Sequence, residues 1–256
     1  MMNRITDTVK HLIIINVILW IATIILFKQN ILDLENILAF HYPGSPFFKP
    51  WQFITHMFMH ASIDQNGSVI IYHLLFNMIG LWMFGSPLEQ IWGRNKFLFF
   101  YISAGLGAVL LQLGYNYFQF QQGMDTFLEM GYTSDQIREY LLKDVARIPG
   151  INQELYDIAR NLQGNFLGSM LGASGAVYGI LVAFAFTYPN SELLIYFLFP
   201  VKAKYFVPIL IVSDVFFGFS NYSTGVAHFA HIGGALVGFI MMWYWKKNQF
   251  NKNRWN

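Results

Sequence analysis

Six long apolar stretches constrain the fold of this chain more than any other feature. They cover residues 11–28, 70–86, 97–118, 166–188, 205–220 and 226–245. A helix that crosses a bilayer needs roughly 20 mostly apolar residues. The second and fifth stretches are short and contain polar residues, so their ends are the least defined. The sequence therefore predicts an all-α, polytopic membrane protein, with residues 1–256 forming one domain around a bundle of six transmembrane helices.

The composition is typical of a protein whose surface is largely in contact with lipid. Only 12% of the 256 residues are charged and 55% are hydrophobic, whereas a soluble domain has about 25% charged residues. The chain has no cysteine, which excludes a disulfide framework, a thiol nucleophile and a cysteine-based metal site. A net charge of +2 without a basic cluster outside the tails gives no reason to expect a nucleic-acid partner.

Basic residues predict the orientation of the bundle. With six spans both termini lie on one side, together with the segments after the second and fourth spans. These four segments hold Arg4, Lys10, Arg94, Lys96, Lys202, Lys204, Lys246, Lys247, Lys252 and Arg254. The positive-inside rule therefore predicts that both termini are cytoplasmic. The first stretch lacks a small-residue cleavage site and is expected to stay as an uncleaved span. In the absence of an organelle transit pattern, we expect a bacterial inner (plasma) membrane.

Two long loops, 29–69 and 119–165, are expected on the opposite side. The second mixes acids and bases, and its apolar residues Ile137, Leu141 and Val145 recur at helical spacing. This pattern is typical of an amphipathic helix that lies on or near the membrane surface. We interpret the loop as an elaboration of the bundle rather than a separate domain.

One serine stands among small residues in the fourth apolar stretch, in the sequence Gly172-Ala173-Ser174-Gly175. Serine and glycine are common in membrane helices because they let two backbones approach closely. Helix packing is therefore the simplest interpretation. A nucleophile also needs a second helix close by, so the glycines fit both interpretations.

Histidines in the last apolar stretch favour a catalytic role for Ser174 over simple helix packing. Ionisable side chains inside a membrane span are costly and usually face a polar interior. His231 either donates to a neighbouring carbonyl or acts as a general base that takes the proton of the serine. His228 lies three residues earlier on the same helical face. It is a candidate for orienting His231, for binding substrate or for contacting water.

A further set of histidines precedes and opens the second span. His73 and Asn77 are four residues apart and offer hydrogen-bond donors of the kind that stabilise an oxyanion. His56 and His60 have the spacing of a zinc-binding helix, but Met57 stands where the zinc-protease pattern requires glutamate. We therefore predict no metal and no cofactor.

Taken together and in this order, the motifs resemble the rhomboid family of intramembrane serine proteases. The segment around Ser174 is similar to the family's GxSG motif, and the segment around His231 to its last-helix histidine motif. The resemblance implies that Ser174 is the nucleophile and His231 the base. His73 and Asn77 fall on the family's HxxxN motif, which implies an oxyanion hole completed by the backbone N–H of Ser174.

The resemblance also implies supporting roles. Tyr178 matches a tyrosine that packs on the histidine ring. Gly172 and Gly175 flank the nucleophile, and His228 stands where some members have asparagine. The family usually works as a Ser–His dyad, and no acid completes a triad in an obvious place. We expect Asp214, in the fifth span, to be structural or to line a polar pocket.

The sequence departs from the family in its loops. Trp51-Gln52 replaces a usual Trp-Arg, and residues 61–72 form a longer connection between His60 and His73. The first difference bears on how the loop is anchored and the second on how substrate approaches, and neither removes a catalytic group.

The resemblance implies an endopeptidase that cleaves single-span membrane proteins in or near their transmembrane segments. Three alternatives remain: a catalytically silent rhomboid-like protein that binds membrane clients, a channel or transporter that uses the buried histidines, and a membrane zinc protease.

Overall fold

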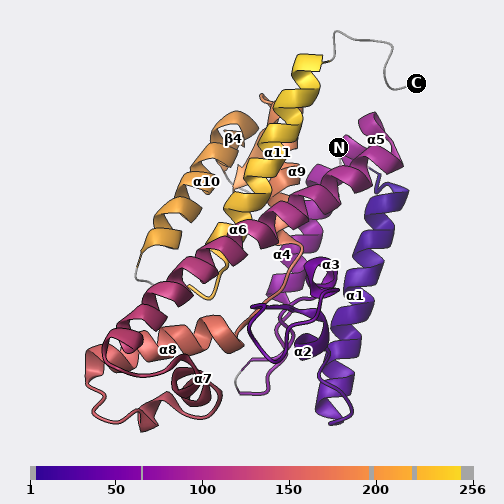
Figure 1. Cartoon of the computed structure of the whole chain (residues 1–256). Helices are drawn as coiled ribbons and strands as arrows, with labels where there is room; N and C mark the ends of the chain where they lie inside the picture. Colours follow the sequence, from indigo (N-terminus) through magenta and orange to yellow (C-terminus); the bar gives the residue numbers. More distant parts are fainter. Residues whose placement is uncertain (1–3, 65, 196–198, 221–223, 249–256) are drawn as a thin grey trace.

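A computed structural model describes residues 4–64, 66–195, 199–220 and 224–248, and helices dominate it (Figure 1). The α-helices are α1 (Asp7–Lys28), α2 (Leu34–Leu38), α3 (Gln52–Thr55), α4 (Tyr72–Gly80), α5 (Ser86–Trp92), α6 (Arg94–Glu129), α7 (Ser134–Leu142), α8 (Gln153–Leu167), α9 (Ser174–Thr187), α10 (Ala203–Phe219) and α11 (His228–Asn248). Shorter turns are η1 (His56–Phe58), η2 (Leu81–Gly85), which is a π-helix, and η3 (Val145–Arg147). The predicted helical class is thus confirmed in its main part.

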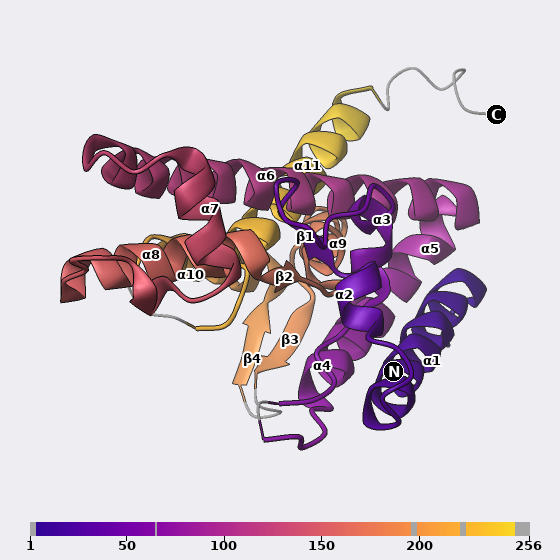
Figure 2. The ribbon, with the colours of Figure 1, turned by 60° about the horizontal axis from the view of Figure 1, so that its bottom comes forward.

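Two small antiparallel sheets add to the helices. Strands β1 (Phe40–His41) and β2 (Ser169–Met170) pair with each other, and β3 (Glu192–Ile195) pairs with β4 (Phe199–Lys202). The first pair joins the loop before α3 to the chain just ahead of α9 (Figure 2). It therefore fixes the approach of the chain to Ser174.

By length and hydropathy, two of the described helices are suited to cross a membrane: α1 and the 36-residue α6. α9 is also apolar but has only 14 residues. The stretch predicted as the second span is a continuous helical run of α4, η2 and α5, and α6 extends well beyond the predicted 97–118. The start of α1 and the end of α11 lie at one end of the bundle, and α2, α7 and α8 at the other (Figure 1).

The prediction of one helix over 166–188 is wrong at its beginning. α8 ends at Leu167, a strand follows, and α9 begins only at Ser174. Gly172 has a φ of +127°, a conformation that residues with a side chain rarely adopt. A regular helix cannot pass through this position, so Gly172 lies outside the helix that begins at Ser174.

Glycines bring α9 and α11 into backbone contact. A Cβ on Gly234 of α11 would lie 1.8 Å from the carbonyl oxygen of Gly175 in α9. A Cβ on Gly179 would lie 2.5 Å from Cβ of Ala104 in α6. Because only small residues permit this approach, the three helices pack as a tight group and place the start of α9 beside the start of α11.

Residues 119–165 form a helical layer of their own rather than one surface helix. The end of α6, α7, η3 and α8 enclose an apolar cluster that includes Phe127, Leu141 and Leu162. Ile137 and Leu141 of α7 are buried in it, whereas Leu142 is 52% exposed. A capping box at Thr133 and Gln136 starts α7.

Candidate active site

Ser174 and His231 form a hydrogen-bonded pair. Ser174 is the first residue of α9, and His231 lies in the first turn of α11. The Ser174 Oγ and His231 Nε2 atoms are 2.9 Å apart. This is the distance over which a histidine can remove the proton of a serine nucleophile.

Asp214 lies on the other side of the histidine ring. Its Oδ1 is 3.1 Å from Nδ1 of His231 and 2.5 Å from Nδ1 of His228, so one carboxylate oxygen accepts from two imidazoles. The Asp214 side chain comes from α10 and is buried. The sequence alone predicts only a structural or pocket-lining role for Asp214. The cost of a carboxylate inside an apolar helix signals that Asp214 needs a partner, but it does not identify His228 and His231 as those partners.

Tyr178 covers one face of the His231 ring. The two ring centroids are 4.1 Å apart and the planes differ by 15°. Since Tyr178 lies one helical turn after Ser174, α9 supplies both the hydroxyl and the surface against which the imidazole rests. The stacked ring limits the rotation of His231 about its Cβ–Cγ bond.

The tautomer of His73 follows from its contact with the preceding loop. The backbone N–H of Ala61 donates to Nδ1 of His73 (3.1 Å), so the proton of a neutral ring is on Nε2. A Cβ on Gly172 would lie 3.0 Å from this Nε2 and 3.6 Å from Ser174 Oγ. The Nε2–H donor therefore faces the same small space as the serine hydroxyl, and only glycine leaves that space open.

Asn77 contributes less directly. Its Nδ2 donates to the backbone carbonyl of His73 (2.8 Å), which engages one of its two amide protons. The backbone N–H of Ser174 belongs to the first turn of α9, where N–H groups have no partner within the helix and the helix dipole favours negative charge. His73 and the Ser174 amide are thus the donors that this arrangement offers most directly.

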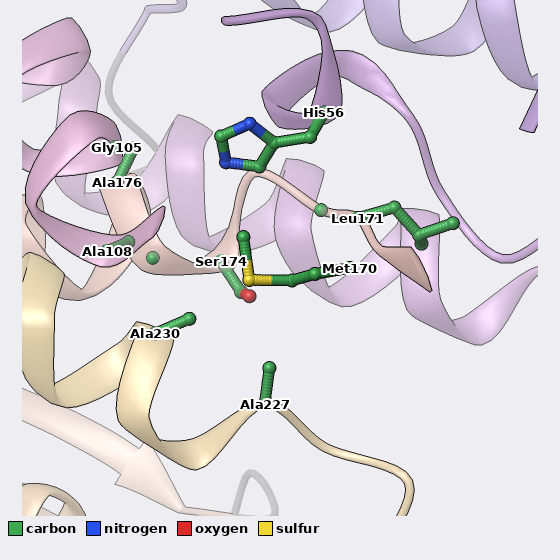
Figure 3. Close-up of a pocket in the computed structure, with 11 residues that line it drawn as sticks. His56, Gly105, Ala108, Met170, Leu171, Ser174, Ala176, Ala227 and Ala230 are labelled. Atoms are coloured by element: carbon green, nitrogen blue, oxygen red, sulfur yellow. The ribbon is translucent and has the colours of Figure 1, made fainter. Parts of the chain in front are cut away.

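A small cavity opens onto Ser174 (Figure 3). It is lined by His56, Gly105, Ala108, Met170, Leu171, Gly172, Ser174, Gly175, Ala176, Ala227 and Ala230. Most of these side chains are small or apolar. The cavity therefore suits a small, uncharged group next to the serine hydroxyl.

His56 and His60 hold the loop before α4 in place. The carbonyl of His56 accepts from the N–H of Gly172 (3.0 Å), and its Nδ1 contacts the Gln52 carbonyl (2.8 Å). The His60 Nε2 contacts Oδ1 of Asn16 in α1 (2.8 Å). Burial lowers the pKa of His56 to about 4 and that of His60 to about 3, so both are neutral at pH 7. The two side chains thus contact different partners, one within the loop and one in α1.

Gln52 organises the same loop. It is fully buried; its Oε1 accepts from the N–H groups of His41 and Lys49, and its Nε2 donates to the carbonyls of Asn36, Ile37 and Phe47. In the sequence, Gln52 is only a departure from the family's usual arginine. The structure shows that a neutral amide satisfies the backbone of this loop.

Comparison with known proteins finds one matching family. The family model described as the Rhomboid domain matches residues 48–126 and 147–248. An uncharacterized mitochondrial rhomboid protein of Schizosaccharomyces pombe is 26% identical, over 77% of this chain and 52% of its own. RHOMBOID-like protein 12, mitochondrial, of Arabidopsis thaliana is 27% identical, over 77% and 47%. The rhomboid protease AarA of Providencia stuartii is 24% identical, over 75% and 54%.

These relatives can be compared with this chain in their length and in the compartment given in their names. The chain spans about half the length of the curated relatives it matches. The prediction of a bacterial plasma membrane is wrong on this comparison, because the two most similar of these relatives are named as mitochondrial. The prediction depended on the absence of a transit pattern, and that absence does not identify a compartment.

Proposed function

Because the chain belongs to the rhomboid family, we propose that it is a serine endopeptidase that hydrolyses peptide bonds in or near the transmembrane segment of single-span membrane proteins. The contact between Ser174 Oγ and His231 Nε2, at 2.9 Å, carries this proposal. The relative named as a rhomboid protease supports it. No cofactor takes part in the proposed reaction.

The proposed reaction starts at Ser174. Its Oγ attacks the peptide carbonyl carbon while Nε2 of His231 takes the hydroxyl proton. The carbonyl oxygen gains negative charge and is stabilised by the His73 Nε2–H, the Ser174 N–H and the free amide proton of Asn77. Collapse of this intermediate breaks the C–N bond, and the leaving amine takes the proton from His231. Water, deprotonated by His231, then hydrolyses the ester on Ser174.

The proposed membrane arrangement has six spans: α1, the run from α4 to α5, α6, α9, α10 and α11. Side chains on the outer faces of these helices support it. Ile18 of α1, Phe76 of α4, Phe99 of α6, Phe216 of α10 and Ile240 of α11 are all more than half exposed and apolar. Large apolar groups in such positions suit contact with lipid.

Labelling with a fluorophosphonate tests the catalytic proposal. The purified protein in detergent is expected to take up the probe at Ser174, because the probe reacts only with an activated serine. Ser174→Ala and His231→Ala are expected to abolish labelling, whereas Ser213→Ala, which removes an exposed serine of α10, is expected to label like the parent. A folded parent that does not label would contradict the proposal and would favour a silent rhomboid-like protein that binds membrane clients.

Cleavage of a single-span substrate completes the test. The parent and Ser174→Ala are incubated in proteoliposomes with a tagged membrane protein whose span contains a small residue in a helix-destabilised segment. Cleavage by the parent alone supports the proposal. Transport of an ion that depends on His231, without any cleavage, would favour the channel interpretation.

A further inference from the structure

We propose that Asp214 is a positioning residue that keeps the proton of His231 on Nδ1. The chain would then use a triad of Ser174, His231 and Asp214 rather than a Ser–His dyad. The proposal rests on the proposed function, because it concerns the same base. It assigns a role to a buried carboxylate of α10 that the mechanism above does not use.

The geometry specifies the tautomer. A carboxylate only accepts hydrogen bonds, so the 3.1 Å contact between Asp214 Oδ1 and His231 Nδ1 requires the proton on Nδ1. The Nε2 atom then carries the lone pair, and it is the atom that contacts Ser174 Oγ at 2.9 Å. The opposite tautomer would place an N–H against the serine and could not take its proton.

His228 holds the carboxylate in place. Its Nδ1 donates to the same Oδ1 at 2.5 Å, and its Nε2 contacts Thr224 Oγ1 at 2.7 Å. The Thr224 hydroxyl can donate to this Nε2, which leaves the His228 proton on Nδ1, facing Asp214. Two donors on one oxygen fix the rotation of the Asp214 side chain and offset the cost of burying its charge.

Packing of α10 on α11 keeps the three groups together. A Cβ on Gly218 would lie 3.3 Å from Cβ of His228 and 3.2 Å from the ring of Phe229. The ring of Phe217 also stacks on His228, with centroids 5.8 Å apart. The carboxylate therefore reaches the imidazoles across a helix pair in close contact.

The first measurement is the tautomer of His231 in the parent protein. Nitrogen-15 NMR of histidine-labelled protein in detergent distinguishes a protonated Nδ1 from a protonated Nε2, and the spectrum of His231→Gln identifies the signal. We expect a protonated Nδ1 in the parent. A proton on Nε2 of His231 in the neutral parent would overturn the proposal, whatever the outcome of any variant.

The second measurement compares Asp214→Asn with Ser213→Asn. The amide introduced by Asp214→Asn would donate to Nδ1 of His231 and favour the wrong tautomer. We expect the rate of fluorophosphonate labelling to fall about 10²- to 10⁴-fold, in line with the loss when Asp becomes Asn in a Ser-His-Asp triad, and the His231 proton to move to Nε2. Ser213→Asn places the same amide on the exposed side of α10 and is expected to leave rate and tautomer unchanged.

The outcomes separate this proposal from the proposed function. The role of Asp214 is overturned if the parent labels and the Asp214→Asn protein labels within about twofold of it and keeps Nδ1 protonated. The protease proposal would remain intact.

Asp214, His228 and His231 also have the composition of a metal site. Loss of labelling in a chelator, with recovery in zinc, would show that the cluster holds a metal and would overturn the positioning role.

Discussion

The backbone N–H of Gly172 donates to the carbonyl of His56 at 3.0 Å. This bond ties the chain two residues before Ser174 to the loop ahead of α4, the same loop whose Ala61 amide sets the tautomer of His73. The proposed nucleophile and the donor proposed to stabilise the oxyanion thus both contact one loop. Changes in that loop are expected to act on the reaction without touching Ser174 or His231.

Gly172→Ala is expected to reduce labelling of Ser174 by at least about tenfold. The φ of +127° strains any residue with a side chain, and the new methyl would lie 3.0 Å from Nε2 of His73. The strained backbone would shift the chain just before Ser174, and the methyl would block the space in front of the His73 Nε2–H donor. The rate of fluorophosphonate labelling measures the effect, with Gly164→Ala as control because a Cβ there meets nothing within 4 Å. Equal rates for the two variants would contradict the prediction.

Gln52→Leu is expected to lower the free energy of unfolding by about 2–4 kcal/mol, because it leaves several buried backbone groups without partners. Thermal unfolding in detergent, in a Ser174→Ala background that prevents self-cleavage, measures the change. Gln153→Leu removes an exposed glutamine with one side-chain bond to Asp157 and is expected to change stability by less than about 0.5 kcal/mol. A Gln52→Leu protein as stable as this control would show that the loop does not depend on the amide.

His73→Ala is expected to slow substrate cleavage more than Asn77→Ala. Loss of one oxyanion donor costs about 10²- to 10³-fold in rate, and the His73 Nε2–H faces the serine. Asn77 already has one amide proton on the His73 carbonyl, so its removal is expected to cost less. The turnover rates of the two variants on one substrate provide the comparison. A larger loss for Asn77→Ala would mean that Asn77 turns toward the substrate in the transition state.

The sequence was sufficient for the helical class, the family and the pairing of Ser174 with His231, because each leaves a local pattern or a motif. It was insufficient for the start of α9. The apolar run from 166 to 188 contains a strand and a glycine with positive φ. Hydropathy alone does not predict where the backbone leaves the helical conformation. It was also insufficient for Asp214, since contact between α10 and α11 is a tertiary property that no spacing within the chain specifies.

Lowering the pH from about 7 to about 5 is expected to destabilise the loop that contains His56 and His60. Burial lowers the pKa of both side chains, to about 4 and about 3, below the value near 6.5 of an unfolded histidine. Between the folded and unfolded pKa values the unfolded state binds more protons, so stability decreases as the pH falls through this window. Hydrogen exchange of residues 36–62 measures the opening of the loop.

Two variants locate the source of this pH dependence. His60→Gln, whose amide can still donate to Asn16, is expected to weaken it, whereas replacement of the exposed His11 by Gln should leave it unchanged. Protection factors, which correct the exchange rates for the intrinsic effect of pH on amide exchange, that are equal at both pH values in the parent would refute the link to the buried imidazoles.

Gly234→Ala is expected to separate α11 from α9 and to reduce both stability and labelling. The added Cβ would lie 1.8 Å from the Gly175 carbonyl, a backbone atom that cannot move aside without shifting its helix. A shift of α9 relative to α11 lengthens the contact between Ser174 and His231, and a misplacement of about 1 Å can cost about 10²-fold in rate. Gly114→Ala in α6, where a Cβ meets nothing within 4 Å, is the matched control. The two variants are compared by thermal unfolding and by the rate of fluorophosphonate labelling. A Gly234→Ala protein that matches the control in both would show that close backbone contact is not what holds the serine against its base.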